Sequence, residues 1–205
     1  MAADGTSAPA RERLLQAADE LFYARGIAAT GVDAVLRRAG ASPGTLYAHF
    51  SGKDGLVAAY LQRRHHRFRA AWDAVLAEVE DPVDRLLCVF DALALFRERE
   101  GATRGCAVLA AAAELPAIDH PARVWIEADT TLLHERLHEL ALAAGADDPG
   151  ALVTELVLVY DGVLAGYARA ATDPMPAARG LARDAVRRHA TTDAARRPQR
   201  PSGVR

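Results

Sequence analysis

A short run of small and hydrogen-bonding side chains offers the clearest chemistry in this 205-residue sequence. It consists of Ser42, Gly44, Thr45, Tyr47 and His49. Hydroxyl and imidazole groups, together with the backbone that a glycine leaves open, can pair with the donors and acceptors on base edges in a DNA major groove. The pattern therefore indicates a DNA contact. The alternative is a helical corner on the protein surface that binds nothing.

Local signals place this run on a short helix. Ser42 followed by Pro43 is typical of an N-cap and a first helical position, and we expect the helix to cover residues 43–49. A helix of this length is marginal in water by itself. It therefore depends on neighbouring elements for support, and its exposed tip is free to contact a ligand.

The flanking sequence predicts those neighbours. Thr30 with Asp33 forms a capping pattern for a helix over 32–39 that ends at Gly40. Ser51 with Asp54 repeats this pattern before a third helix. The segment thus predicts a helix–turn–helix.

This segment resembles the DNA-binding domain of the TetR/AcrR (tetracycline-repressor) family of bacterial regulators. The resemblance departs from the usual family pattern at Ala41 and Gly52. It is carried by residues at fixed spacings, namely Thr30, Ala39, Gly40, Ser42, Gly44, Thr45, Leu46, Tyr47, His49, Phe50, Lys53, Asp54 and Leu56.

The resemblance implies a sequence-specific regulator, most simply a repressor that a small molecule releases from a palindromic DNA operator. The residues implied to face DNA are Ser42, Gly44, Thr45, Tyr47 and His49, with Thr30 and Lys53 holding the phosphate backbone.

Composition is consistent with a globular protein, with 51% hydrophobic and 25% charged residues. The net charge of −2 excludes a generally basic chain, so DNA affinity has to come from a local surface. A non-specific architectural DNA binder would normally be more basic. We expect a cytoplasmic protein, because the start of the chain lacks a secretory signal pattern and Cys88 and Cys106 form no disulfide framework.

Helical periodicity continues along the chain and predicts an all-α fold of about nine helices. We expect a flexible N-terminus over 1–8, a DNA-binding domain over 9–55, a ligand-binding and dimerisation domain over 56–190, and a disordered tail over 191–205. Besides the two short helices, the predicted helices cover 9–25, 51–80, 82–99, 106–115, 120–144, 149–171 and 174–189.

The helix predicted over 149–171 is apolar on more than one face, which indicates full burial or a subunit interface. A dimer suits DNA recognition, because one short helix contacts too few base pairs to be specific. The resemblance also implies pairing of the last two helices into a four-helix bundle. Candidate interface residues are Leu156, Tyr160, Val163, Leu164, Leu181 and Val186.

The resemblance further implies a small-molecule pocket in the body, with an apolar or aromatic effector. Core packing is the alternative for each candidate. The candidates are Phe68, Trp72, Phe90, Leu93, Cys106, Trp125, Leu133 and Tyr167.

Three other features suggest further hypotheses. His134 and His138 have the spacing of metal ligands on a helix, and Cys106 could sense oxidants at a helix N-terminus. The basic run 63–69 favours a solvated helix face over a DNA contact. No nucleophile elbow, phosphate loop or HExxH motif indicates an enzyme, and no cofactor or membrane partner is expected. A small-molecule-binding protein or an enzyme without DNA function is the remaining alternative.

Overall fold

The computed structural model describes residues 9–101, 105–115, 119–169 and 172–190. Within them the protein has ten α-helices and no strand. The flexible N-terminus predicted over 1–8 and the disordered tail predicted over 191–205 lie outside the described residues. The helices are α1 (Ala10–Arg25), α2 (Val32–Ala39), α3 (Pro43–Phe50), α4 (Lys53–Ala77), α5 (Pro82–Leu87), α6 (Val89–Arg99), α7 (Ala107–Glu114), α8 (Arg123–Ala143), α9 (Pro149–Ala168) and α10 (Met175–His189).

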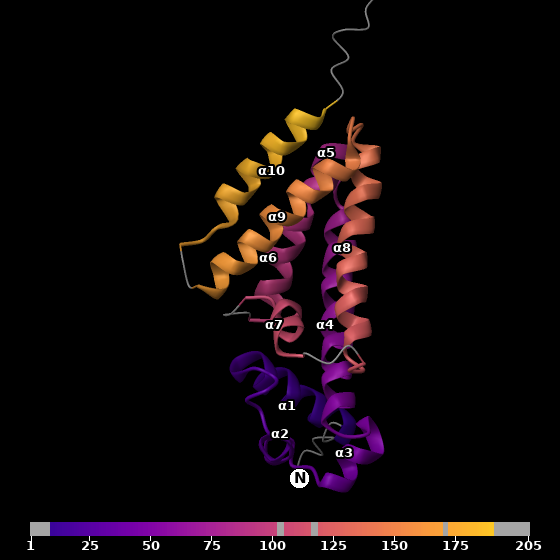
Figure 1. Cartoon of the computed structure of the whole chain (residues 1–205), viewed down its shortest axis with the longest axis vertical. Helices are drawn as coiled ribbons and strands as arrows, with labels where there is room; N and C mark the ends of the chain where they lie inside the picture. The colour runs from indigo at the N-terminus through magenta and orange to yellow at the C-terminus, as the bar shows by residue number, and fades with distance from the viewer. Residues whose placement is uncertain (1–8, 102–104, 116–118, 170–171, 191–205) are drawn as a thin grey trace, which may run out of the picture.

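The helices form a small head and a larger body (Figure 1). Helices α1, α2 and α3 gather at one end, and the long α4 runs from them into the body. Helix α8 packs along α4, while α9 and α10 lie against each other at the side of the body. Helix α7 lies between the head and the body. The all-α prediction is therefore confirmed.

Several predicted helix starts are confirmed by side-chain caps. The hydroxyl of Ser42 accepts a hydrogen bond from the Thr45 backbone N–H at 3.2 Å. The carboxylates of Asp81 and Asp148 cap α5 and α9 in the same way. A side-chain oxygen satisfies backbone N–H groups that have no partner within the first turn, so these residues fix where each helix begins.

The helix predicted over 82–99 is instead two helices, which raises the number from nine to ten. Helix α5 ends at Leu87 and α6 begins at Val89. Cys88, between them, keeps helical dihedral angles of φ −65° and ψ −10°. The chain therefore hardly changes its local conformation, and no glycine or proline marks the break.

Two predicted caps are wrong. Helix α2 begins after Gly31, and the Thr30 side chain does not cap it. Helix α4 begins after Gly52, whereas Ser51 ends α3 in a left-handed conformation. The capping pattern was present at both sites, but the tertiary contacts of the chain decided the conformation.

Each part has its own apolar core. The core of the head includes Leu14, Val35 and Leu46, and it extends along α4 to Leu61. It also takes in apolar residues of α7 and the start of α8. The head is thus packed directly on the body, and α4 is not the sole connection. The core of the body contains residues such as Trp72, Phe90, Leu137, Leu156 and Ala182.

Candidate nucleic-acid interface and body cavities

Helix α3 presents the candidate DNA-contacting residues on its outer side. Tyr47 is 66% exposed, and Ser42, Gly44 and His49 are also exposed, whereas Thr45 is half-buried. On the inner side, Leu46 and Phe50 are buried in the core of the head. Helix α3 therefore has an exposed polar face and a buried apolar face. The structure brings the five predicted residues together on this short helix and its N-cap.

The hydroxyls at the start of α3 are held in place by the cap. Ser42 Oγ lies 2.9 Å from Thr45 Oγ1, in addition to accepting from the Thr45 backbone. A hydroxyl carries one proton and two lone pairs, so both groups retain hydrogen-bonding capacity for a base edge or a phosphate. The cap thus orients Thr45 as well as starting the helix.

Two glycines let the start of α4 approach the end of α3. Gly52 has φ 107°, a conformation that side chains rarely adopt, and an added Cβ would lie 3.4 Å from the Tyr47 ring. At Gly55, a Cβ would lie 1.6 Å from the backbone oxygen of Phe50, which is impossible without moving the backbone. This close packing holds Lys53, the half-buried first residue of α4, beside α3. Both a lysine ammonium and a helix N-terminus favour phosphate.

The predicted contact of Thr30 with the DNA backbone needs correction. Thr30 is 1% exposed, and its hydroxyl donates to the carbonyl oxygens within the head at Gly26 (2.6 Å) and Leu21 (3.3 Å). Its hydroxyl therefore ties the loop before α2 to the end of α1. A buried hydroxyl engaged in this way cannot reach a phosphate, because opening the loop would leave buried polar groups unpaired.

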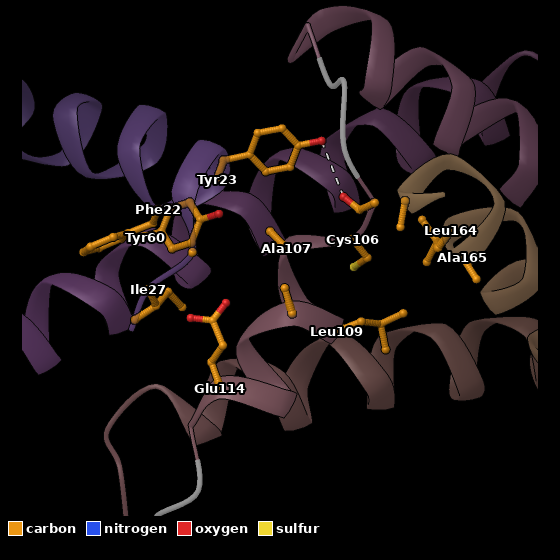
Figure 2. A pocket seen from close by; sticks show the side chains of 14 residues that line it. Phe22, Tyr23, Ile27, Tyr60, Cys106, Ala107, Leu109, Glu114, Leu164 and Ala165 are labelled. Atoms are coloured by element: carbon orange, nitrogen blue, oxygen red, sulfur yellow. Dashed lines mark hydrogen bonds between the residues drawn. The ribbon is translucent and has the colours of Figure 1, made fainter. Parts of the chain in front are cut away.

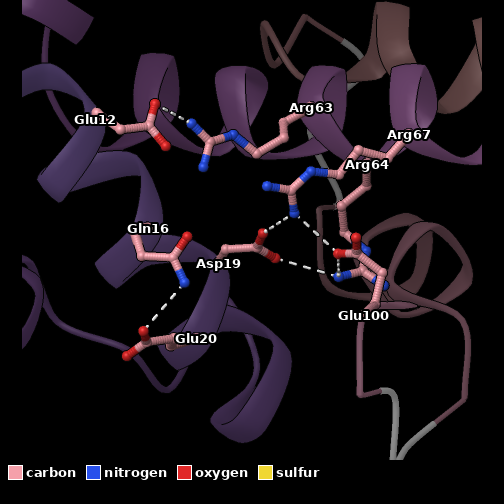
Figure 3. A network of polar contacts seen from close by, with 8 residues as sticks. All are labelled: Glu12, Gln16, Asp19, Glu20, Arg63, Arg64, Arg67 and Glu100. Atoms are coloured by element: carbon pink, nitrogen blue, oxygen red, sulfur yellow. Dashed lines mark hydrogen bonds and ion pairs between the residues drawn. The ribbon is translucent and has the colours of Figure 1, made fainter. Parts of the chain in front are cut away.

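The basic run 63–69 serves the junction between the head and the body (Figure 3). Arg64 is 7% exposed, so the prediction of a solvated face is wrong for this side chain. It lies 3.2 Å from Asp19 of α1 and 3.7 Å from Glu100 at the end of α6. Arg67 contacts the same two carboxylates at 3.0 and 2.9 Å. The two arginines thus link the head to the body.

Two adjoining cavities lie near this junction. One has a volume of about 330 Å³ and lies between α1, α4, α7 and α9 (Figure 2). The other, of about 40 Å³, is lined by three of the predicted pocket residues, Phe68, Leu93 and Cys106. Cys106 borders both cavities.

The other predicted pocket residues lie elsewhere. Trp72 and Phe90 are fully buried in the core of the body, so their packing accounts for them. Trp125, Leu133 and Tyr167 line neither of these two cavities. The sequence showed which residues are apolar but not which of them border a space.

The redox and metal hypotheses receive no support from the geometry. Burial raises the pKa of the Cys106 thiol to about 11, which favours packing over the alternative of an activated, oxidant-sensing thiol. His134 and His138 line an open surface depression. Among the described residues, no group of three or more His, Cys, Asp or Glu side chains is placed to hold a metal ion.

The predicted dimer residues also need correction. Five of them are buried inside one protomer, namely Leu156, Tyr160, Val163, Leu164 and Val186. They pack in the protomer's own core and are unavailable as the main contacts of an interface. The sixth, Leu181 on α10, is 59% exposed, and Leu158 on α9, which we did not predict, is 68% exposed.

Helix α9 therefore has apolar residues on its buried face and on its exposed face. Within the part of the chain that the structure describes, it is the one helix long and apolar enough to cross a membrane. A core helix that also has an exposed apolar face meets the same criterion, so this is weak evidence of a membrane span.

Known proteins share this fold and this head. Residues 14–60 match the family model for bacterial regulatory proteins of the tetR family. The structure is similar to SCO4454, a TetR-family transcriptional regulator from Streptomyces coelicolor, with a TM-score of 0.80 and 31% identity over 88% of this chain and 95% of that one. It is also similar to a TetR transcriptional regulator (sav143) from Streptomyces avermitilis, with a TM-score of 0.73 and 32% identity over 86% and 98% of the two chains.

Sequence similarity to curated proteins is concentrated in a shorter stretch. The HTH-type transcriptional regulator Rv1255c of Mycobacterium tuberculosis is 36% identical over 78 residues, which cover 38% of this chain and 39% of that protein. The match thus spans about two fifths of the length of this relative.

The fold, the helix–turn–helix head and these similarities define a helix–turn–helix transcriptional regulator. The chain belongs to the TetR family. The family predicted from the sequence is confirmed, and with it the class of protein, a DNA-binding regulator and not an enzyme.

Proposed function

We propose that this protein is a homodimeric repressor that binds a palindromic double-stranded DNA operator through α3 and is released by a small-molecule effector. The observation that carries the proposal is the exposure of Tyr47, at 66%, on a helix whose opposite face is anchored by Leu46 and Phe50. A large exposed aromatic residue on a rigid support suits contact with a phosphate or a thymine methyl group.

The proposed DNA surface consists of the outer side of α3 and the start of α4. Thr45 and His49 supply hydrogen-bonding groups beside Tyr47, and Lys53 supplies a positive charge for a phosphate. Because the whole chain has a net charge of −2, phosphate attraction has to be local to this surface. Thr30 is a structural residue in this proposal.

The proposed dimer pairs α9 and α10 of two protomers. The exposed apolar residues Leu158 and Leu181 lie on these helices, and Gly162 and Ala165 continue the exposed side of α9. Small residues allow helices to approach closely, and the large ones bury apolar area. A two-fold dimer would contact two half-sites about 34–36 Å apart on DNA, or a multiple of that distance.

A regulator of this kind acts in the cytoplasm, where its operator is. An effector releases DNA when it binds more tightly to a conformation whose two heads no longer match the half-sites. The cavity of about 330 Å³ is within the size range of small-molecule sites.

The test is a binding titration at fixed salt against the intergenic DNA beside the gene for this protein, with scrambled DNA as competitor. We expect tight binding by a dimer that scrambled DNA does not displace. Equal displacement by specific and scrambled DNA would contradict sequence-specific recognition, and binding by a monomer would contradict the proposed pairing.

A further inference from the structure

The larger cavity is built from both the head and the body. Phe22 and Tyr23 of α1 and Tyr60 of α4 line it on the side of the head. Cys106 before α7 and Leu164 of α9 line it on the side of the body. Figure 2 shows these side chains around the space, with Tyr23 reaching across toward the segment before α7. Any molecule bound here would contact both parts.

Glu114, at the end of α7, is the one formally charged side chain among the described residues that line this cavity, and those residues include no lysine, arginine or histidine. Arg64, which lies 4.8 Å from the centre of the Tyr23 ring, is paired with Asp19 and Glu100. The Glu114 Oε2 atom accepts a hydrogen bond of 2.7 Å from the Ala28 backbone N–H. Figure 2 shows the carboxylate pointing toward Ile27, on the side of the head. A carboxylate that already accepts one hydrogen bond still has lone pairs for a second donor.

The remaining walls suit the apolar body of a ligand. Phe22, Tyr23 and Tyr60 border the space. The Phe22 and Tyr60 side chains are only 3% and 1% exposed, and the Arg64 guanidinium already lies 4.8 Å from the centre of the Tyr23 ring, so the charge of a ligand has to pair with Glu114. Aliphatic side chains supply apolar contact for the rest of a ligand. An anion would be repelled by Glu114 and would find no cationic partner among the described lining residues.

We propose that this cavity is an effector site for a primary organic ammonium ion with a compact apolar body, and that Glu114 pairs with the ammonium group. The binding site stands on the cavity itself, while its effect on DNA rests on the regulator function proposed above.

The contacts around the cavity explain how a ligand could affect the head. Tyr23 donates from its hydroxyl to the Gly105 carbonyl oxygen at 3.4 Å, and Glu114 holds Ala28. Both contacts join α1 or the loop after it to the segment that carries α7. An ammonium ion that pairs with Glu114 adds a second donor to the carboxylate that also holds the Ala28 N–H, so the ligand contact and the contact with the head share one group. Ligand affinity therefore depends on the position of the head, and by linkage the ligand changes DNA affinity by the same factor.

The first test uses three probes with the same apolar body, 4-phenylbutylammonium, 4-phenylbutanol and 4-phenylbutyrate, measured by calorimetry on the full chain without DNA. We expect the ammonium to bind at least tenfold more tightly than the alcohol, and the carboxylate most weakly. Equal affinities, or a preference for the carboxylate, would overturn the proposal.

Two variants and one matched control test whether the ligand binds in this cavity. Glu114→Gln keeps a carbonyl oxygen for the Ala28 N–H but loses the charge, so the preference for the ammonium over the alcohol should disappear while the alcohol binds as before. Ala110→Phe fills the cavity and should weaken all binding at least tenfold. Ala113→Phe, on the same helix but outside the cavity lining, is the matched control and should bind normally. An unchanged preference in Glu114→Gln, or equal binding by the two phenylalanine variants, would overturn the assignment.

A separate titration with operator DNA distinguishes the two proposals. Saturating 4-phenylbutylammonium should change operator affinity about 5-fold or more in the wild-type chain and leave it unchanged in Glu114→Gln. Failure of the wild-type chain to bind any DNA would count against the regulator function while leaving the calorimetric result intact. Ammonium binding that left operator affinity unchanged would overturn the effector role.

Discussion

Replacing Asp19 by asparagine should destabilise the protein through the junction between head and body. Asp19 is 8% exposed and pairs with Arg64, which is 7% exposed, at 3.2 Å, and with Arg67 at 3.0 Å. The Arg64 guanidinium also lies 4.8 Å from the centre of the Tyr23 ring. In the variant, Arg64 keeps its aromatic neighbours but loses its nearer carboxylate.

The size of the destabilisation follows from the contacts that Arg64 and Arg67 keep in the variant. Breaking a buried ion pair by removing one partner costs about 3–5 kcal/mol. In the variant, Glu100 stays 3.7 Å from Arg64 as a remaining partner. The Arg67 side chain is 39% exposed and can turn to water. We therefore expect a smaller loss, of about 2–3 kcal/mol, in the free energy of unfolding. For a chain of this size, that is a fall of about 4–12 °C in Tm. Urea denaturation followed by circular dichroism, at one fixed protein concentration, measures it.

The matched control is Glu20→Gln, one residue further along α1. Glu20 pairs with Arg38 at 2.7 Å, but these side chains are 39% and 58% exposed. An exposed pair contributes about 0–1 kcal/mol and weakens in salt, so the control should lose little and its loss should shrink at high salt. If Asp19→Asn lost no more than Glu20→Gln, the reasoning that the Arg64 network holds the head to the body would be refuted.

Further predictions follow from the packing and burial of single residues. Gly55→Ala should lower head stability and abolish operator binding, because its Cβ would clash with the Phe50 carbonyl oxygen; normal thermal unfolding would contradict this. Leu158→Arg and Leu181→Arg should each shift the protein toward a monomer in sedimentation experiments with helical content unchanged, and an intact dimer in both would exclude the proposed seam. Burial raises the pKa of Cys106 to about 11, so its alkylation at pH 8 should be on the order of 100-fold slower than that of an unperturbed thiol. The folded state holds the thiol proton more tightly than the unfolded chain does, because the thiol pKa of the unfolded chain is about 8.5. The free energy of unfolding contributed by this thiol should therefore fall as the pH rises from about 8.5 to 11, and Cys106→Ser should remove this pH-dependent loss.

Helices and their starts were the most predictable features of the fold. Ser42, Asp81 and Asp148 each precede a proline and each cap a helix, because the signal and the structure depend on the same few residues. Thr30 had a similar signal but took another role. Its hydroxyl donates to the carbonyl oxygens of Leu21 in α1 and of Gly26 directly after α1, contacts that depend on how the head folds.

The interface and the cavity were less predictable, because both depend on which apolar face meets which neighbour. Leu156 and Leu158 lie on the same apolar helix, but Leu156 is buried inside the protomer and Leu158 is 68% exposed. Helical periodicity finds α9 but cannot assign its two faces when both are apolar. Likewise Tyr23 and Glu114 join the head to the body through partners more than 80 positions away, and no local pattern marks such contacts.

Operator binding by Tyr47→Ala tests the central claim most directly. The measurement compares this variant with wild type at matched salt, and with Leu142→Ala, which removes an exposed apolar side chain from α8 in the body. We expect Tyr47→Ala to weaken operator binding by about 1–3 kcal/mol, or roughly 5- to 150-fold, with helical content unchanged. Leu142→Ala should bind as wild type does. Unchanged operator affinity in Tyr47→Ala would contradict the account of α3 as the surface that contacts DNA.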